Sequence, residues 1–405
     1  MSKNIPQLRF EGFTYDWKQR KLGTLAKFSK GKGYTKGDLI EDGVPIILYG
    51  RLYTKYQTII SDIDTYVDAL ENSVLSEGSE VIVPSSGETS EDIARAAVVD
   101  NKGVILGGDL NIIKPSKKLE SSFLALTISN GEAQKELMKK AQGNSVVHLY
   151  NNDLKEVKLF YPDNLEQTKI GNFFKTLDDT ITLHQRKLDL LKEQKKGYLQ
   201  KMFPKNGAKV PELRFAGFAD DWEERKLGDV LSERNDQTPE TNEYPLMSFV
   251  QGKGVTPKGE RYNRSFLVKD SEKKYKKTEL GDFIYSSNNL ETGSIGFNRT
   301  GKAVISPVYS IFKSKKSRES QFIGIMSARK DFISKMVRFR QGVVYGQWRI
   351  HESDFLNIDM KMPNDKEQQL IISFFENIDK TIALHQRKLD LFKEQKKGFL
   401  QKMFV

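Results

Sequence analysis

The chain has 405 residues, of which 65 are lysine or arginine and 54 are aspartate or glutamate, so its formal net charge at pH 7 is +11. It has no cysteine, which excludes disulfides, thiolate metal sites and cysteine nucleophiles and is typical of the reducing cytoplasm. The first letters, MSKNIPQLRF, lack the apolar core of a signal peptide, and no run approaches the length of a transmembrane helix. The positive charge alone is a weak indication of a nucleic-acid partner.

The first feature in chain order is residues 6–23, PQLRFEGFTYDWKQRKLG, which recur at residues 211–228 as PELRFAGFADDWEERKLG. The two copies share their arginine, tryptophan and several aromatic positions. We expect each copy to pack the entrance of a domain against the ends of the long helices described below. A surface for a partner protein is the alternative.

A segment of mixed strands and helices follows each copy of this motif. Apolar runs bounded by glycine and proline predict strands at 43–50, 80–84, 103–108 and 111–115 in the first half, and at 243–250, 281–287 and 302–313 in the second. Residues 121–143 and residues 320–339 each predict one helix. The two halves share this order of elements with different letters, so the chain is a tandem duplication.

Each half ends in a long predicted helix, at 165–203 and 366–404. The segment 183–203 returns at 384–404 with only two changes, and Pro204 should end the first copy. Apolar residues at spacings of three and four favour a coiled-coil seam. The predicted seam consists of Leu177, Ile181, His184, Leu188, Leu191 and Tyr198 in the first copy, and of Ile378, Ile382, His385, Leu389, Phe392 and Phe399 in the second.

A single stripe is too narrow to bury itself, so each helix is expected to pair with the other copy. Their connection favours an antiparallel pair with the two variable segments at opposite ends. His184 and His385 would then face each other near the middle; the alternative is that each packs separately against its own domain. We predict an α+β fold, with two mixed α/β domains separated by an antiparallel coiled coil of two long helices and an internal pseudo-two-fold repeat.

Catalytic motifs are missing from the sequence. There is no G-x-x-x-x-G-K-[ST] phosphate loop, no H-E-x-x-H and no glycine-rich S-adenosylmethionine motif, and the four histidines are far apart. We therefore expect no enzyme activity, no metal and no cofactor bound by this chain. An active site built from scattered residues stays open as the enzyme alternative.

The loops favour DNA. Lysine and arginine can neutralise phosphates, and arginine, asparagine and glutamine have the paired geometry that distinguishes base edges in the major groove. Glu88 and Glu291 could accept a hydrogen bond from cytosine or could stabilise their turns. Ordinary solvated loops are the alternative for the whole set. The candidate DNA-binding residues are Lys30, Lys32, Tyr34, Lys36, Arg51, Tyr53, Lys55, Ser85, Ser86, Thr89, Arg95 and Asn144 in the first half, and Lys253, Lys258, Arg261, Arg264, Ser287, Asn288, Asn289, Thr292, Arg299, Tyr345, Gln347 and Arg349 in the second.

Residues in the first half of each long helix resemble those of a known protein family. The first copy carries Glu166-Gln167, Ile170, Phe173-Phe174, Ile181 and residues 184–187, and the second carries Glu367-Gln368, Ile371, Phe374-Phe375, Ile382 and residues 385–388. With the entrance motifs at 17–23 and 222–228, this pattern resembles the specificity (S) subunit of type I restriction-modification enzymes. The resemblance covers essentially the whole chain and is strongest in the helices.

The resemblance implies a non-catalytic DNA reader in the cytoplasm. Target-recognition domains at 1–162 and 205–363 would each read one half of an asymmetric, two-part DNA site, and conserved helices at 163–204 and 364–405 would be the spacers. Two methyltransferase (M) subunits carrying S-adenosylmethionine would dock, and restriction (R) subunits would join them. Helix length would set the unread gap. A coiled-coil DNA-binding scaffold or regulator without restriction partners is the alternative.

Overall fold

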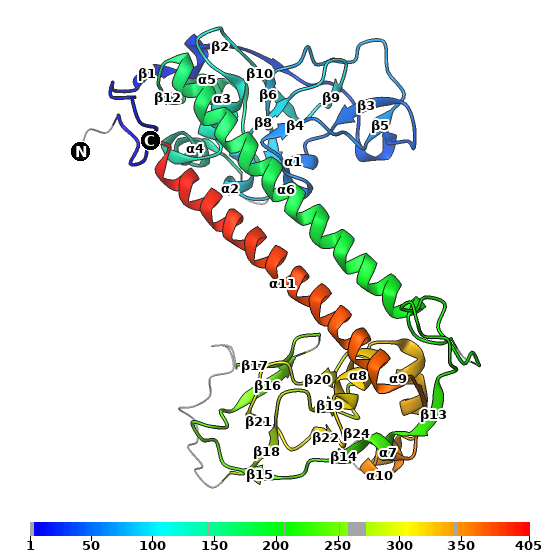
Figure 1. The fold of residues 1–405 in the computed structure, drawn as a ribbon. Coiled ribbons are helices and arrows are strands. Elements are labelled where there is room, and N and C mark those ends of the chain that lie inside the picture. The colour runs from blue at the N-terminus through cyan, green and yellow to red at the C-terminus, as the bar shows by residue number, and fades with distance from the viewer. Residues whose placement is uncertain (1–3, 144–145, 206, 251, 258–272, 344–346) are drawn as a thin grey trace. The chain divides into compact units, whose positions relative to one another are not determined.

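The structure is a computed structural model that describes residues 4–143, 146–205, 207–250, 252–257, 273–343 and 347–405. The chain forms two compact units, unit 1 with Met1–Arg186 and Gln386–Val405, and unit 2 with Lys187–His385. The long helices α6 (Asn164–Lys201) and α11 (Asp365–Lys402) each contribute residues to both units (Figure 1). Their bounds lie within two residues of the predicted ones. The predicted domain bounds separate the long helices from the domains, whereas each compact unit includes parts of both helices. The four predicted domain segments therefore stay a prediction.

Unit 1 is built on a mainly antiparallel five-stranded sheet with the order β2-β10-β6-β8-β4. A three-stranded sheet (β5-β3-β9) and two short pairs, β1 with β12 and β7 with β11, complete it. The strands are β1 (Lys18–Lys21), β2 (Ala26–Lys30), β3 (Val44–Ile47), β4 (Ile59–Ile60), β5 (Tyr66–Val67), β6 (Glu80–Pro84), β7 (Ser86–Gly87), β8 (Ala97–Val99), β9 (Ile105–Leu106), β10 (Leu110–Pro115), β11 (Val147–His148) and β12 (Lys158–Tyr161).

The short helices of unit 1 are α1 (Arg51–Thr54), α2 (Ser90–Ile93), α3 (Ser121–Ile128), α4 (Gly131–Lys140) and α5 (Asn151–Glu156), with 3-10 turns at Leu22–Thr24 and Lys36–Asp38. All five residues of β6 are buried, because the apolar run EVIVP lies in the middle of the sheet. Helix α3 shares the core with this strand: Phe123, Val81 and Val83 belong to one apolar cluster.

Unit 2 has a four-stranded sheet (β14-β22-β19-β20), a three-stranded sheet (β15-β18-β21), the pair β13–β25 and two hairpins. Its strands are β13 (Glu223–Lys226), β14 (Leu231–Glu233), β15 (Gln237–Thr238), β16 (Met247–Val250), β17 (Gly254–Pro257), β18 (Tyr275–Thr278), β19 (Phe283–Tyr285), β20 (Ile295–Phe297), β21 (Ala303–Ile305), β22 (Ser310–Ser314), β23 (Gln341–Val343), β24 (Gln347–Arg349) and β25 (Asp359–Met362). Its short helices are α7 (Leu227–Val230), α8 (Glu319–Met326), α9 (Lys330–Val337) and α10 (Glu352–Leu356). Buried aromatic rings hold the four-stranded sheet against α10, with the Phe312 and Phe355 centroids 4.6 Å apart.

Three predicted elements are each two elements in the structure. The predicted helix 121–143 is divided into α3 and α4, because Gly131 has a φ of +69° and the N–H of Glu132 donates to the carbonyl of Val405 (2.7 Å). The predicted helix 320–339 is divided into α8 and α9, where the hydroxyl of Ser327 donates back to the carbonyl of Gly324 (2.8 Å).

The predicted strand 302–313 is also divided. Its two parts, β21 and β22, belong to different sheets, and Pro307 between them has no N–H with which to continue a ladder.

The entrance motif packs against helix ends in both units, as predicted. In unit 1, Arg9 forms a bidentate ion pair with Glu166 at the start of α6, at 2.6 and 2.7 Å. In unit 2, Arg214 forms the same pair with Glu367 at the start of α11, at 2.7 and 2.8 Å. The tryptophans of both motifs are buried in the cores. The motif therefore fixes the chain entrance to the first turn of each long helix.

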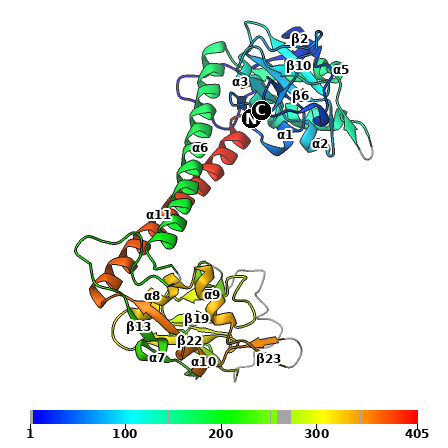
Figure 2. The same cartoon turned by 90° about the vertical axis from the view of Figure 1, so that its right-hand side faces the viewer.

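Within each unit the two long helices run antiparallel (Figure 2). In unit 1, Phe173 contacts Phe399 with 5.0 Å between ring centroids, and further along α6 His184 contacts Phe392 at 5.3 Å. In unit 2, Tyr198 contacts Phe374 at 4.9 Å. All twelve predicted seam residues are buried or half-buried in the structure. The expected His184–His385 pair joins residues of different units and stays a prediction.

Candidate nucleic-acid interface

In unit 1 the structure brings together loops that are far apart in sequence. Lys30 at the end of β2 pairs with Asn111 of β10, and Asn111 pairs in turn with Val83 of β6. The chain beyond β6 forms β7, which pairs with β11, and the N–H of Leu149 donates to the carbonyl of Ser85 (3.1 Å). The buried amide of Asn111 donates to the carbonyl of Leu149 (2.8 Å). Segments 85–87 and 147–149 of the two predicted loops therefore lie side by side, beyond the end of the central strand β6.

The candidates in unit 1 differ in their exposure. Side chains are exposed at Lys30, Lys32, Lys36, Lys55 and Thr89, and half-buried at Tyr34, Tyr53, Ser86 and Arg95. Two candidates, Arg51 and Ser85, are buried: they are 9% and 3% exposed. The guanidinium of Arg51 donates to Asp64 (2.7 Å) and Gln57 (3.0 Å), so it holds the loop after α1 instead of facing solvent.

Neighbouring polar groups in unit 1 also make hydrogen bonds within the chain. The hydroxyl of Tyr53 donates to the carbonyl of Ser86 (2.6 Å), and burial raises the pKa of Tyr53 well above its ordinary value. Hydrogen bonds from Lys55 and Arg51 lower the pKa of Asp64. Thr89 accepts from the N–H of Asp92 (3.1 Å) as the N-cap of α2. These contacts hold the loop that carries Lys55 and the segment 86–92.

Two residues beside this contact, His148 and Tyr150, were not among the predicted candidates. Both are exposed, and their rings stack with centroids 6.2 Å apart and an interplanar angle of 16°. Their neighbours Val147 and Leu149 are buried. The alternation of the letters V-H-L-Y is the signal that could have identified them, because every second side chain of an extended segment points to the same side.

Unit 2 joins the corresponding loops by side-chain hydrogen bonds. The carboxamide oxygen of Asn288 accepts from the N–H of Trp348 (2.6 Å), and the hydroxyl of Ser287 accepts from the N–H of Ile350 (3.0 Å). Arg340 forms a bidentate pair with Glu291 at 2.7 and 2.6 Å, which lowers the pKa of Glu291. Glu291 therefore holds the hairpin β23–β24 on the loop after β19, which is the turn-stabilising alternative.

The hairpin and its loop present a mixed polar and aromatic surface. Exposed candidates in unit 2 are Lys253, Asn288, Asn289, Thr292, Gln347 and Arg349, and Ser287 is half-buried. Trp348 is 48% exposed between two of them and was missed by the sequence analysis. Arg299 is also exposed, but its guanidinium pairs with Asp379 of α11. The candidates Asn144, Lys258, Arg261, Arg264 and Tyr345 fall outside the described residues.

The described residues contain no group of three or more histidine, aspartate or glutamate side chains placed to hold a metal ion. Within the same ranges, no helix is both long and apolar enough to cross a membrane.

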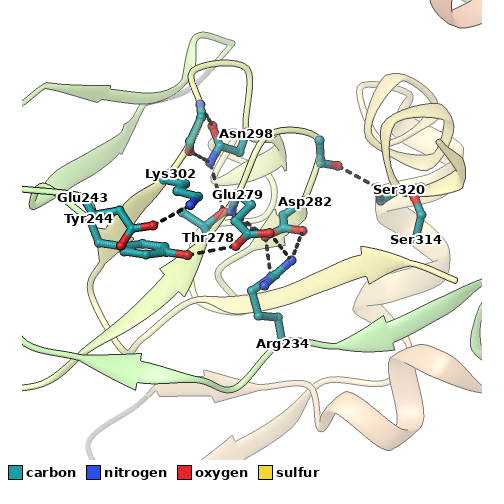
Figure 3. A network of polar contacts seen from close by, with 12 residues as sticks. Arg234, Glu243, Tyr244, Thr278, Glu279, Asp282, Asn298, Lys302, Ser314 and Ser320 are labelled. Carbon is teal, nitrogen blue, oxygen red and sulfur yellow. Dashed lines mark hydrogen bonds and ion pairs between the residues drawn. The ribbon is translucent and has the colours of Figure 1, made fainter. Parts of the chain in front are cut away.

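A buried polar network lies beside the turn that follows β20 (Figure 3). The guanidinium of Arg234 donates to Glu279 (2.9 Å), and its Nε lies 2.8 Å from a carboxylate oxygen of Asp282. Asp282 also accepts from the N–H of Glu279 (2.7 Å) and from the hydroxyl of Thr278 (3.4 Å). The amide of Asn298 donates to the oxygen of Thr278 (3.2 Å), so the network reaches that turn.

Burial raises the pKa of Asp282 from 3.8 to about 6, against the N–H of Glu279 and the charge of Arg234. A raised folded-state pKa contributes stability that is complete below pH 3.8 and is lost as pH rises through about 6. We therefore compare the free energies of unfolding of the native chain and of the variant Asp282→Asn. The value for the native chain minus the value for the variant should fall by about 2 kcal/mol between pH 4.5 and pH 7.5. Urea titrations at the two pH values measure it, and an equal difference at both would refute the expectation.

Comparison with known proteins gives a matching family model and several similar proteins. The model of the type I restriction modification DNA specificity domain matches residues 15–193 and 219–393. A type I restriction enzyme MjaVIII specificity subunit of Methanocaldococcus jannaschii is 20% identical, over 95% of this chain and 91% of that protein. A putative type I restriction enzyme MjaX specificity subunit of the same organism is 22% identical, over 95% and 92%. The crystal structure of an S subunit from M. genitalium matches 99% of each chain, with a TM-score of 0.65 and 13% identity.

Proposed function

Because the chain belongs to the type I restriction-modification DNA specificity family, we propose that it is the non-catalytic subunit that reads DNA for such an enzyme. Each unit reads one half of an asymmetric, two-part site and leaves the base pairs between the halves unread. Two methyltransferase subunits dock on the long helices and bring S-adenosylmethionine, and restriction subunits join through them.

The observation that carries this proposal is the shared site geometry of the two units. In both, the loop after a central strand is joined to the segment that follows α4 or α9, and the joined pair exposes polar and aromatic side chains. Amide and guanidinium groups can bind adenine and guanine edges in the major groove, and the exposed lysines can bind phosphates. Different residues at equivalent positions would let each unit recognise a different half of the DNA site.

Exposed leucines on the long helices support the docking of partners. Leu183 and Leu190 of α6 are 67% and 51% exposed, and Leu384 and Leu391 of α11 are 52% and 56% exposed. Within each helix the two leucines are seven residues apart, so they lie on one face, and they lie outside the seam. Large apolar side chains repeated on an otherwise charged helix are typical of a surface that another helix covers.

Arg349→Ala should test the reading surface of unit 2. Loss of a guanidinium that contacts a base costs about 1–3 kcal/mol, so we expect the complex with its methyltransferase to bind its site roughly 5–150-fold more weakly. Tolerance of changed base pairs should rise in one half-site only. Binding to a panel of singly substituted duplexes at fixed salt measures both effects.

Lys316→Ala is the matched control for this measurement, because Lys316 is an exposed cation of the same unit outside the joined loops. It should leave the sequence preference unchanged. If Arg349→Ala binds all duplexes as the native complex does, the hairpin does not read bases.

A further inference from the structure

Asp379 of α11 joins three parts of unit 2. One carboxylate oxygen lies 2.5 Å from the ammonium nitrogen of Lys195 on α6, and the other lies 2.6 Å from Nη1 of Arg299 in the turn after β20. The Asp379 side chain is 23% exposed, so both ion pairs are partly shielded from water. A single carboxylate thus connects the two helices to each other and to the recognition domain.

Unit 1 repeats this junction with different chemistry. Asp178 of α6 lies at the equivalent position in the other helix copy. One of its oxygens lies 2.5 Å from the ammonium of Lys396, and the other accepts from the hydroxyl of Thr58 at 3.3 Å. The link between the helices is therefore the same in both units, whereas the link to the domain is a long hydrogen bond from an uncharged hydroxyl in unit 1 and an ion pair in unit 2.

The turn that carries Arg299 is held firmly. The carboxamide oxygen of the buried Asn298 accepts from the N–H of Thr300 (2.9 Å), and its amide donates to the carbonyl of Gly301 (2.7 Å). The guanidinium carbon of Arg299 lies 4.2 Å from the centroid of the Phe297 ring. The network around Asp282 supports the same turn from the sheet side (Figure 3). Arg299 is thus preorganised to meet Asp379.

A second charged contact ties the domain of unit 2 to α11. Arg318, at the N-cap of α8, forms an ion pair with Glu376, three residues before Asp379. In unit 1 the position equivalent to Glu376 is Lys175, so this ion pair has no acidic counterpart on α6. Besides the arginine–glutamate pair that both units share, unit 2 therefore has two ion pairs between its domain and α11, at Arg299 and Arg318.

We propose that Asp379 and Arg299 are positioning residues that fix the second recognition domain on its helices, and thereby set how strictly the complex selects the unread gap in its DNA site. This inference rests on the proposed function for its consequence on DNA. One base pair lengthens a duplex by about 3.4 Å, so a strict gap requires a domain that shifts by less than that distance. The uncharged hydroxyl that meets Asp178 makes the first domain less dependent on such a pair.

The first measurement needs no DNA. Because the chain has no cysteine, spin labels can be placed at K192C on α6 and K313C on β22, both exposed positions of unit 2. Arg299→Gln and Asp379→Asn should broaden the distance distribution between the labels. Lys195→Gln, which breaks only the link between the helices, should leave it narrow. Equal widths in all four proteins would overturn the proposal.

The second measurement uses the chain assembled with its methyltransferase on duplexes whose gap is native, one base pair shorter or one longer. Arg299→Gln and Asp379→Asn should raise methylation at the altered gaps relative to the native gap by roughly tenfold, as expected from the loss of a charged hydrogen bond. An equal decrease at all gaps would instead make Arg299 a DNA contact or a general stabiliser and would overturn the positioning role. Failure of the native complex to methylate any two-part site would count against the proposed function, and the spin-label result would still decide the positioning.

Discussion

Glu367→Gln should lower the free energy of unfolding of unit 2 by about 3–5 kcal/mol, because it leaves a buried cation without its partner. The Glu367 side chain is 1% exposed and accepts two hydrogen bonds from Arg214, whose pKa this pairing raises. Arginine stays charged after the substitution, so its desolvation is no longer offset. Urea unfolding of the full chain, with hydrogen exchange to separate the two units, measures the effect.

The duplication supplies a matched control for this prediction. Glu166→Gln breaks the same pair in unit 1, where the side chain is fully buried, and should destabilise unit 1 in place of unit 2. The double change Arg214→Met with Glu367→Met should cost less than Glu367→Gln alone, since no buried charge is left unpaired. A loss below about 1 kcal/mol in Glu367→Gln would show that this pair behaves as an exposed one.

Leu183→Glu together with Leu190→Glu should abolish the capture of the methyltransferase while leaving the chain folded. Burying a leucine side chain contributes about 1.5–3 kcal/mol. Loss of two leucines that the partner covers should therefore weaken binding of the methyltransferase by at least roughly 100-fold. Both residues are more than half exposed in the free chain, so their replacement removes little internal packing. Copurification with a tagged methyltransferase and thermal unfolding of the free chain measure the two quantities.

Leu165→Glu is the control, because Leu165 is equally exposed on α6 (65%) but lies in the first turn of the helix, about five turns before Leu183. It should retain the partner. Capture of the methyltransferase by the doubly substituted chain would move the docking surface away from this face of the helix.

The long helices and the entrance motif could be predicted because they occur twice in the sequence and have regular spacing. The helix breaks at Gly131 and Ser327 could not be predicted from local pattern, since the first depends on a contact with Val405, far away in the chain. Strand positions were found where apolar runs are short and bounded, as at 80–84, and were merged where Pro307 divides two sheets.

The candidate site was predicted as loops, and the structure adds which side chains those loops expose. Arg51 was chosen for its charge, but its partners Asp64 and Gln57 keep it in the fold. Trp348 was not among the candidates although it stands between Gln347 and Arg349, and the structure shows that it is 48% exposed on β24. The junction at Asp379 needs residues from three distant segments, so no single stretch of sequence contains it.

The most direct test of the account is a map of the methylated adenines in cells that express the chain with its methyltransferase partner. We predict one two-part word with a fixed unread gap, and a chain whose residues 23–162 are exchanged for those of a relative should change one half of the word only. A continuous word, or a change in both halves after the exchange, would contradict independent reading by the two units.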